Sequence, residues 1–324
     1  MKLDFEYLKY LIKTPISRGA RNWIKNYYKE IKIKNFKLFM TLLVKNEEDI
    51  IETNIRFHKA MGVDGFIVTS HNSTDKTNKI LEKLKEDGIV SEIIYEKSNI
   101  YKQSEFVDKM IKLAKNKYKA DWVINADADE FYYSKSLNLK GSILDADNAG
   151  LNAVLVDSIV LFPDDKANYI MDSHYFITNP LRKFEEKFLN LNNMFLGYKN
   201  KFQCPKVIHN IKDYRAIQMG NHDVVMKNKK LVQIEDIKLY HYHIRNYKQW
   251  EEKILRYLDT EMPQNCGIHM LQMIDTYKSG KLREKYEQSY GEDIRNFLIQ
   301  EGAVSIDKSV SNFLIYKNIK KCER

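Results

Sequence analysis

Apolar and polar positions alternate in blocks along the first 130 residues. Runs of strand length that are rich in apolar residues occupy residues 37–44, 65–70, 89–96 and 122–131. The stretches between them carry apolar residues at intervals of three and four, as in Phe106, Met110 and Leu113, which is the spacing of a helix face. Strands that alternate with helices in this way predict a parallel sheet with helices packed on it.

The pattern changes after about residue 136. Residues 152–162 form a long apolar run that predicts one buried strand, and segments rich in aromatic residues and histidine follow. From residue 247 onward, helical spacing dominates. We therefore expect a segment 1–36, a domain 37–245 with halves 37–135 and 136–245, and a helical region 246–324.

The N-terminal segment holds most of the net charge. Residues 1–37 contain ten basic against three acidic residues, a net charge of +7 out of +9 for the chain. Apolar residues such as Leu8 and Trp23 are interleaved with the basic ones, which predicts an amphipathic helix suited to an anionic membrane surface. A helix packed on the domain is the alternative. Nucleic acid is not expected, because the basic excess lies outside the segment that carries the chemistry.

The cysteines and the overall hydropathy bear on location. Cys204, Cys266 and Cys322 are widely spaced and form neither a disulfide framework nor a zinc pattern, which favours a reducing compartment. We find no signal peptide and no run of about 18 apolar residues able to span a bilayer. A cytoplasmic protein is expected, either free or peripheral on the inner face of the membrane.

Three carboxylates, Asp127, Asp129 and Glu130, end the fourth apolar run. They repel one another, and leaving them unpaired at the end of a buried strand would be costly. A divalent cation bridged to phosphate oxygens would neutralise them, and hard oxygen ligands suit Mg²⁺ or Mn²⁺. The alternative is a solvated strand end with carboxylates in water or paired with lysines. An EF-hand is excluded, because its obligatory Gly would fall on Glu130 and its final Glu on Ser136.

Polar residues follow three of the predicted strands. Asn46, the turn at 70–77 and the acidic cluster all lie at strand ends, and the carboxyl ends of parallel strands form the edge where ligands bind. We also expect Asn46 to cap the first helix, and one residue of the turn to cap the second. Three segments distant in sequence should therefore meet in one crevice.

Residues 38–133 resemble glycosyltransferase family 2 and its relatives with the GT-A fold. The resemblance rests on three motifs in order along the chain, which are Asn46-Glu47, Ser73-Thr74-Asp75-Lys76-Thr77 and the D-x-D stretch Asp127-Ala128-Asp129-Glu130-Phe131. It implies an α/β fold of GT-A type, a Rossmann-like, mostly parallel sheet flanked by helices. It also implies a hexosyltransferase that uses a UDP- or GDP-sugar.

The resemblance assigns roles on the donor side. Asp127 and Asp129 would hold Mn²⁺ or Mg²⁺ against the donor diphosphate, where the cation stabilises the departing nucleoside diphosphate. The donor itself would be bound by Asn46, Glu47, Ser70, Asn72, Asp75 and Asp127. In one departure from the family, an Asp that often holds the nucleobase is replaced by Ser70-His71-Asn72, where Asn72 could substitute.

Relatives with this fold often supply a histidine from a late strand as a further metal ligand. His241 is the first candidate, because it alternates with tyrosines and so shares a strand face with His243. His222 is the second candidate. His58, on the first predicted helix, is expected to be structural.

An inverting transfer also needs a base for the acceptor hydroxyl proton. Asp223, Asp157 and Glu130 are candidates, and no spacing rule chooses among them. Lys206 and Arg245 could offset phosphate charge.

We therefore predict a metal-dependent, inverting glycosyltransferase that moves a sugar from a nucleotide-sugar donor to a glycan or lipid-linked acceptor in bacterial-type surface polysaccharide synthesis. A nucleotidyltransferase is one alternative, although its usual Gly-rich phosphate loop is lacking in "VKNEEDI" near the first strand. A non-catalytic nucleotide-sugar or glycan-binding module at the membrane surface is the other. The intact Asp127 and Asp129 argue against that module.

Overall fold

The structure is a computed structural model of the 324-residue chain. It describes residues 36–98, 102–167, 170–178, 205–258 and 268–319, with a few positions between 19 and 35. The basic segment expected at 1–36 therefore lies almost wholly outside the described residues, and so do all three cysteines.

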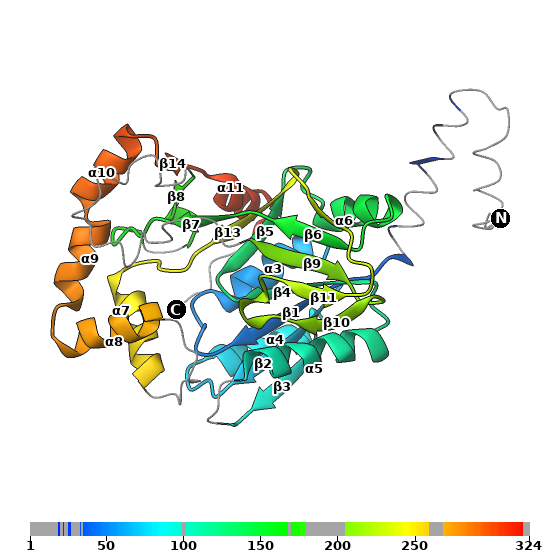
Figure 1. Cartoon of the computed structure of the whole chain (residues 1–324), viewed down its shortest axis with the longest axis horizontal. Coiled ribbons are helices and arrows are strands. Elements are labelled where there is room, and N and C mark those ends of the chain that lie inside the picture. Colours follow the sequence, from blue (N-terminus) through cyan, green and yellow to red (C-terminus); the bar gives the residue numbers. More distant parts are fainter. Residues whose placement is uncertain are drawn as a thin grey trace.

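A seven-stranded sheet forms the centre of the molecule (Figure 1). Its strands, in spatial order, are β12 (Leu231–Gln233), β6 (Ala153–Val156), β9 (Lys206–Asn210), β4 (Trp122–Asp127), β1 (Leu38–Val44), β2 (Gly65–His71) and β3 (Val90–Glu96). Only β9 runs antiparallel to its neighbours, β4 and β6. The mostly parallel α/β sheet predicted from the sequence is confirmed.

Helices cover both faces of this sheet. On one face lie α3 (Ile51–Ala60), α4 (Thr77–Glu86), α6 (Leu139–Asn148) and α11 (Ser309–Tyr316), and on the other lies α5 (Gln103–Asn116) with the hairpin β10 (Tyr214–Ile217) and β11 (Val224–Met226). Alternate residues of β1 enter the two cores, Met40 and Leu42 one and Phe39 and Leu43 the other. Burial on both faces explains why such strands read as continuous apolar runs.

A second sheet of five strands continues from the first. Its order is β14 (Val304–Ile306), β8 (Tyr175–Ile177), β7 (Ser158–Leu161), β13 (Ile237–His241) and β5 (Glu130–Ser134). The single strands predicted at 122–131 and 152–162 are therefore wrong. Each run breaks, at 128–129 and at Asp157, because the chain passes there from the large sheet to the small one. The first break places the acidic residues at the junction of the two sheets.

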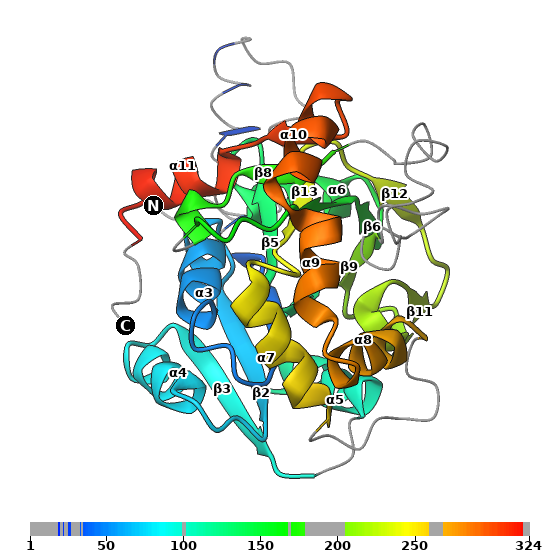
Figure 2. The same cartoon turned by 90° about the vertical axis from the view of Figure 1, so that its left-hand side faces the viewer.

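The helices predicted beyond residue 247 are observed, although β14 interrupts them. They are α7 (Tyr247–Leu258), α8 (Ile268–Lys278), α9 (Leu282–Tyr290) and α10 (Glu292–Gln300). Earlier in the described residues lie the 3-10 helices η1 (Ile170–Asp172) and η3 (Met219–Asn221). Trp250 and Ile254 of α7 join a third core with Tyr286 of α9. Figure 2 shows α7 and α9 in front of the sheets. Within the described part of the chain, no helix combines the length and the apolar character needed to cross a membrane.

Candidate active site

The turn that carries the acidic residues is held by helix α3. The buried Asn54 side chain donates to the carbonyl of Ala128 at 3.0 Å and to that of Glu130 at 2.7 Å. His58, one helical turn later, accepts from the backbone N–H of Tyr132 at 2.9 Å and donates from Nδ1 to the Asn54 carbonyl at 2.9 Å. Buried backbone groups need such partners. His58 thus has the structural role expected of it.

Strand β13 brings histidines to this turn. It pairs antiparallel with β5, so that His241 lies opposite Glu130, and the N–H of Tyr242 donates to the carbonyl of Asp129 at 2.8 Å. His243 follows, and the ring centroids of the two histidines are 5.1 Å apart. The side-chain ligand atoms of Asp129, His241 and His243 all lie within 4.8 Å of one another. We call these three residues the Asp129 cluster.

The Asp129 cluster fits a divalent cation. Ligand atoms about 2.1 Å from one ion lie up to roughly 4.2 Å apart, so small side-chain movements would suffice. One carboxylate with two imidazoles favours a transition ion such as Mn²⁺ over Mg²⁺. Asp127 and His222 lie outside this group. The Asp127 carboxylate is partly exposed beside Lys206, and Nδ1 of His222 donates to the Pro205 carbonyl at 3.1 Å.

Two lysines supply counter-charges for the acidic residues. Lys206, at the start of β9, is only 4% exposed, and its Nζ lies 2.8 Å from Oε1 of Glu130 and 3.6 Å from Oδ2 of Asp127. Nζ of Lys253, on α7, lies 3.4 Å from Oδ2 of Asp129. The chain therefore neutralises much of the acidic charge with its own lysines, but Asp129 and Glu130 are buried, so the turn is not the solvated strand end that was the alternative to a metal site.

The acidic side chains differ in their readiness to ionise. Burial alone would raise the pKa of Asp129, but Lys253 and His241 hold that pKa well below its ordinary value. Burial raises the pKa of Glu130 in spite of the nearby Lys206 ammonium. Asp129 is therefore ionised at neutral pH, and Glu130 holds a proton more readily.

The loop after β1 is tied to the turn after β2. The N–H of Thr74 donates to Oδ1 of Asn46 at 2.7 Å, and the N–H of Asn46 donates to Oγ of Ser73 at 3.2 Å. Asn46 adopts φ 55°, a left-handed conformation that asparagine tolerates better than most residues. Helix α3 begins only at Ile51, so the prediction that Asn46 caps it is wrong. Asn46 instead bridges two loops at the carboxyl edge.

The remaining residues predicted for donor binding lie in the same two loops. Asp75 accepts from the N–H groups of Glu48 at 3.1 Å and Thr77 at 2.9 Å, at the start of α4. The N–H of Glu47 donates to the Thr77 hydroxyl at 2.8 Å. On the side of β3, Ser70 donates to Asn78 at 2.6 Å and the side chain of Asn72 to the carbonyl of Ser98 at 2.9 Å. The predicted convergence of the loops is observed.

Two arginines cover Glu47 from the second half of the chain. Nη2 of Arg245 lies 3.6 Å from Oε2 of Glu47 and 2.8 Å from Oδ2 of Asp49. Nη1 of Arg256 lies 3.5 Å from Oε1 of Glu47 and donates to the carbonyls of Lys45 at 2.7 Å and Asn46 at 2.5 Å. Burial raises the pKa of Glu47 to about 7 against the pull of these guanidinium groups.

Sequence reasoning missed Lys253 and Arg256. Both lie on α7, three residues apart, and resemble the solvated charges of an ordinary amphipathic helix. The available signal was their position beside Trp250 and Ile254, which mark the buried face of that helix. Arg245, which was expected to offset phosphate charge, lies beside Glu47.

The three candidate bases occupy different surroundings. Asp223 is partly exposed, pairs with Lys229 and accepts from the N–H of Val224 at 2.8 Å. Asp157 accepts from Gln233 where β6 gives way to β7. Glu130 is fully buried against Lys206. Of these three, only Glu130 belongs to the acidic turn, and within the described residues no hydrogen bond or ion pair joins Asp223 or Asp157 to that turn.

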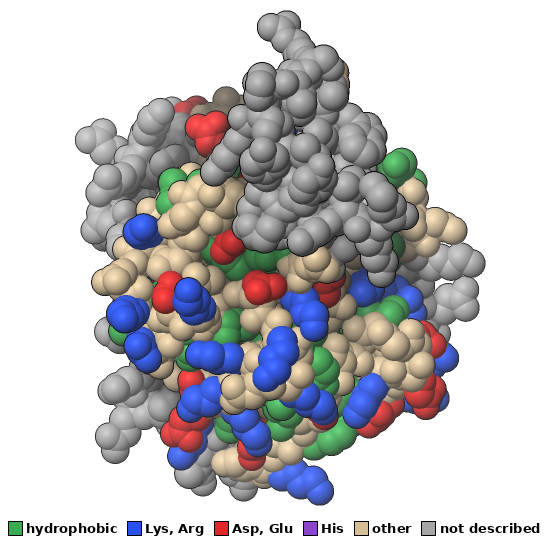
Figure 3. Space-filling model, turned by 90° about the vertical axis from the view of Figure 1, so that its right-hand side faces the viewer, with side chains coloured by type: hydrophobic (Ala, Val, Ile, Leu, Met, Phe, Trp, Pro, Cys, Tyr) green, Lys and Arg blue, Asp and Glu red, His purple; other side chains and the backbone are tan. Residues whose placement is uncertain are grey.

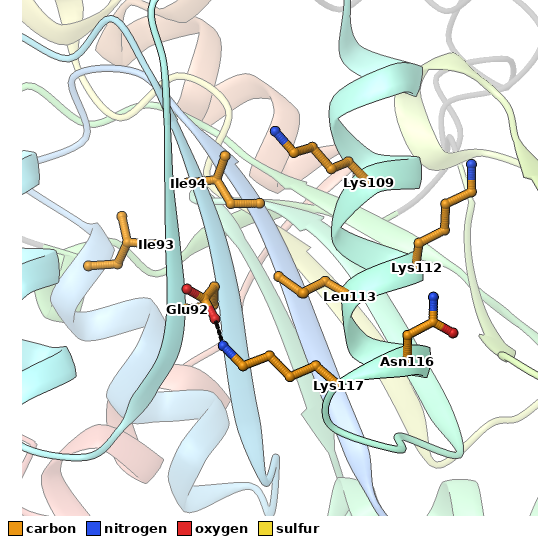
Figure 4. A pocket seen from close by; sticks show the side chains of 8 residues that line it. All are labelled: Glu92, Ile93, Ile94, Lys109, Lys112, Leu113, Asn116 and Lys117. Carbon is orange, nitrogen blue, oxygen red and sulfur yellow. Dashed lines mark hydrogen bonds and ion pairs between the residues drawn. The ribbon is translucent and has the colours of Figure 1, made fainter.

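A groove of about 520 Å³ lies elsewhere, between β3 and α5 (Figure 4). Ile94 and Leu113 form apolar parts of its lining, and Lys117 pairs with Glu92 across it. It shares no residue with the Asp129 cluster or with the loops after β1 and β2. We therefore place the candidate site at the carboxyl edge of the sheet and not in this groove.

On the face of the molecule seen in Figure 3, basic side chains are interspersed with acidic ones.

Comparison with known proteins identifies relatives. Residues 40–296 match the model of Glycosyltransferase family 92. No curated protein matches the chain. Solved structures with similarity include S. aureus TarS, at 12% identity and a TM-score of 0.40, covering 78% of this chain and 44% of that one. TarS 1–349 in complex with UDP has 12% identity, a TM-score of 0.38, and coverage of 89% and 93%.

A third solved structure is glucosyl-3-phosphoglycerate synthase from Mycobacterium tuberculosis, in complex with Mn²⁺, UDP-glucose and phosphoglyceric acid. It has 15% identity and a TM-score of 0.30, and the match covers 57% of this chain and 60% of that one. The match to the first of these TarS structures covers 44% of that chain, so this chain spans less than half of its length.

Proposed function

Because the chain belongs to glycosyltransferase family 92, we propose that it transfers a sugar from a nucleotide-sugar donor to an acceptor hydroxyl, with a divalent cation in the Asp129 cluster. The GT-A-type glycosyltransferase expected from the sequence is confirmed at that level, with family 92 in place of family 2. The cation, the donor, the stereochemistry and the acceptor are our proposal.

One observation carries the proposal. The Asp129 cluster and the loops after β1 and β2 lie at one edge of the sheet, and α7 reaches both. Its Lys253 lies beside Asp129, and its Arg256 donates to the carbonyls of Lys45 and Asn46. A nucleotide sugar needs a nucleoside site, counter-charges for a diphosphate and a place for the reacting sugar, in that order. The two loops, the basic residues of α7 and the Asp129 cluster lie next to one another at this edge, which supports the assignment of these three roles to them.

On the donor side, the loops would hold the nucleoside. Asn46 and Asn72 both adopt positive φ just beyond the carboxyl ends of β1 and β2, the edge where ligands bind in open α/β sheets. Glu47 and Asp75 keep the two loops together, and Ser70 donates to Asn78 within the second segment. We assign a UDP- or GDP-sugar to this site, with Asp127 near the ribose or the diphosphate.

Asp129, His241 and His243 would hold the cation, Mn²⁺ in preference to Mg²⁺, with His222 and Asp127 at a greater distance. When bound, the cation supplies Lewis-acid stabilisation of the departing nucleoside diphosphate. Arg245 and Arg256 add positive charge on the nucleotide side. The bidentate guanidinium geometry suits phosphate oxygens.

An inverting transfer needs a base on the acceptor side. We choose Asp223, whose side chain is 44% exposed, whereas Glu130 is buried against Lys206; Asp157 is the second candidate. Its carboxylate would take the proton of the acceptor hydroxyl as that oxygen attacks the anomeric carbon. A glycan or lipid-linked acceptor of surface polysaccharide synthesis fits this reaction, with residues 1–36 as a contact to anionic membrane.

A thermal-shift screen tests the function. UDP, GDP and their sugar conjugates are each added with and without Mn²⁺, and donor hydrolysis is followed for those that bind. One nucleotide class should stabilise the protein in the presence of Mn²⁺, by about 2.7 kcal/mol when ligand exceeds its dissociation constant a hundredfold. Asp129→Asn should lose the Mn²⁺-dependent part of the shift and the hydrolysis.

Asp275→Asn, at an exposed position of α8, is the matched control and should behave like wild type. Stabilisation by no nucleotide or nucleotide sugar, together with no donor hydrolysis, would contradict the proposal. Pyrophosphate release from a nucleoside triphosphate and a sugar phosphate would indicate a nucleotidyltransferase instead.

A further inference from the structure

Lys253 places a positive charge inside the Asp129 cluster. Its Nζ lies 3.4 Å from Oδ2 of Asp129 and 3.3 Å from both Nδ1 and the carbonyl oxygen of His243. These are two of the three side chains whose ligand atoms lie within 4.8 Å of one another. The ammonium therefore lies close to the position that a cation bound by the Asp129 cluster would take.

The helix that carries Lys253 is anchored on both sides of it. Trp250 and Ile254 are buried in the third core, and Arg256 donates to the carbonyls of Lys45 and Asn46. In Figures 1 and 2, α7 lies off the end of the large sheet. The helix axis is thus fixed, but the four-carbon stem of Lys253 can turn, because its side chain is 18% exposed.

We infer that Lys253 is an internal cation that a divalent metal ion must displace from the Asp129 cluster, and that the displaced ammonium then pairs with the donor diphosphate. The inference rests on the proposed function, because it assumes that the cluster binds metal. Like charges at a separation of a few ångströms repel strongly in a partly buried site, so Lys253 and the metal ion cannot both pair closely with Asp129.

Two consequences follow for binding. Without a nucleotide, the metal ion competes with Lys253 for Asp129 and binds weakly. With a nucleoside diphosphate, the displaced ammonium gains a phosphate partner, so the diphosphate and the metal ion should favour each other's binding by more than their direct contact provides. Linkage requires this coupling to be reciprocal.

Mn²⁺ titrations of the full chain test the inference. Free Mn²⁺ is measured by electron paramagnetic resonance, with and without UDP or GDP, for wild type and for Lys253→Met. The variant should bind Mn²⁺ alone about tenfold more tightly, or better, because a like charge is removed from the cluster. The enhancement of Mn²⁺ affinity by nucleotide should be smaller in the variant than in wild type.

Two further variants complete the design. Lys253→Gln keeps a donor for the His243 carbonyl without the charge, and it should repeat the result even if the methionine variant folds poorly. Lys248→Met removes an exposed lysine of the same helix, paired loosely with Glu252 at 3.9 Å, and should match wild type.

The outcomes separate the two proposals. Equal Mn²⁺ affinity in wild type and both Lys253 variants would overturn the exchange while leaving the metal site intact. Weaker Mn²⁺ binding in the variants would also overturn it, since Lys253 would then support the site. Mn²⁺ binding by neither wild type nor variants, with or without nucleotide, would remove the metal from the proposed function and this inference with it.

Discussion

At the scale of single residues, Lys206 offsets the negative charge of the acidic turn. Lys206 is almost wholly buried, yet it keeps its charge, because Glu130 and Asp127 raise its pKa against the effect of burial. Its Nζ also donates to the carbonyl of Gly220 at 2.6 Å. A buried ammonium of this kind is stable only while its partners remain, because its desolvation is offset by them alone.

Lys206→Met should therefore destabilise the protein by about 3–5 kcal/mol, since Glu130 is left buried with no counter-ion. Urea unfolding measures the loss. The double variant Lys206→Met/Glu130→Gln should recover part of the lost free energy of unfolding, because the uncompensated buried charge is removed. Lys212→Met, at an exposed position in the next turn, should change the free energy of unfolding by less than about 0.5 kcal/mol. A cost for Lys206→Met no larger than that of the control would show that the ion pair is not needed.

At the scale of elements, helix α3 supports the β4–β5 turn from behind. Asn54 is fully buried, and its amide satisfies the carbonyls of Ala128 and Glu130, one on each side of Asp129. The helix therefore determines the direction in which the Asp129 side chain leaves the turn. The contact joins residues more than 70 positions apart in sequence.

Asn54→Leu keeps the side-chain volume and removes the two donors. We expect a loss of about 2–4 kcal/mol in the free energy of unfolding, because two buried carbonyls lose their partners. Lys59→Ala, on the exposed side of the same helix, is the control and should cost far less. A loss for Asn54→Leu below about 1 kcal/mol would mean that the turn finds other donors.

At the scale of the whole molecule, buried histidines set the response to acid. His209, a residue of β9, is fully buried, and its ring stacks on that of Tyr214. Its Nδ1 donates to the carbonyl of Asn210 at 2.9 Å, and its Nε2 accepts from Asn125 at 3.0 Å, so the neutral ring is already satisfied. Burial lowers the pKa of His209 to about 4. Protonating Nε2 would cost the bond to Asn125.

The sign of the pH dependence follows from this shift. In the unfolded chain His209 titrates near 6.5, so between pH 6.5 and about 4 the unfolded state binds a proton that the folded state does not. The stability that His209 contributes is complete above pH 6.5 and is lost as the pH falls toward 4.

Between pH 7 and pH 5, wild type should lose about 2 kcal/mol more than His209→Gln, since each pH unit is worth about 1.36 kcal/mol. Urea unfolding at both pH values measures the difference. Any constant cost of the substitution cancels in this comparison. Parallel losses in the two proteins would show that His209 is protonated as readily when folded as when unfolded.

Much of the large sheet could be predicted from the sequence. The strands β1, β2 and β4 could be predicted because burial on both faces makes them largely apolar, and the intervening helices carry one apolar stripe. The passages of the chain from the large sheet to the small one, at 128–129 and at Asp157, could not be predicted. A change of sheet depends on pairing with β13 and β7, and no local signal marks that event. The division of the chain at 36 and 245 stays a prediction.

By itself, the sequence determined the order of strands and helices through residue 127, the three motifs at the strand ends and the alternation that puts His241 and His243 on one side of their segment. These depend on local spacing, which one stretch of chain contains. Only the tertiary structure decided the inclusion of His243, the pairing of Lys206 and Lys253 with the acidic residues and the meeting of Arg256 with the first loop. The local sequence does not distinguish a lysine whose charge is solvated from one whose charge is buried, because tertiary packing determines which residues lie next to it.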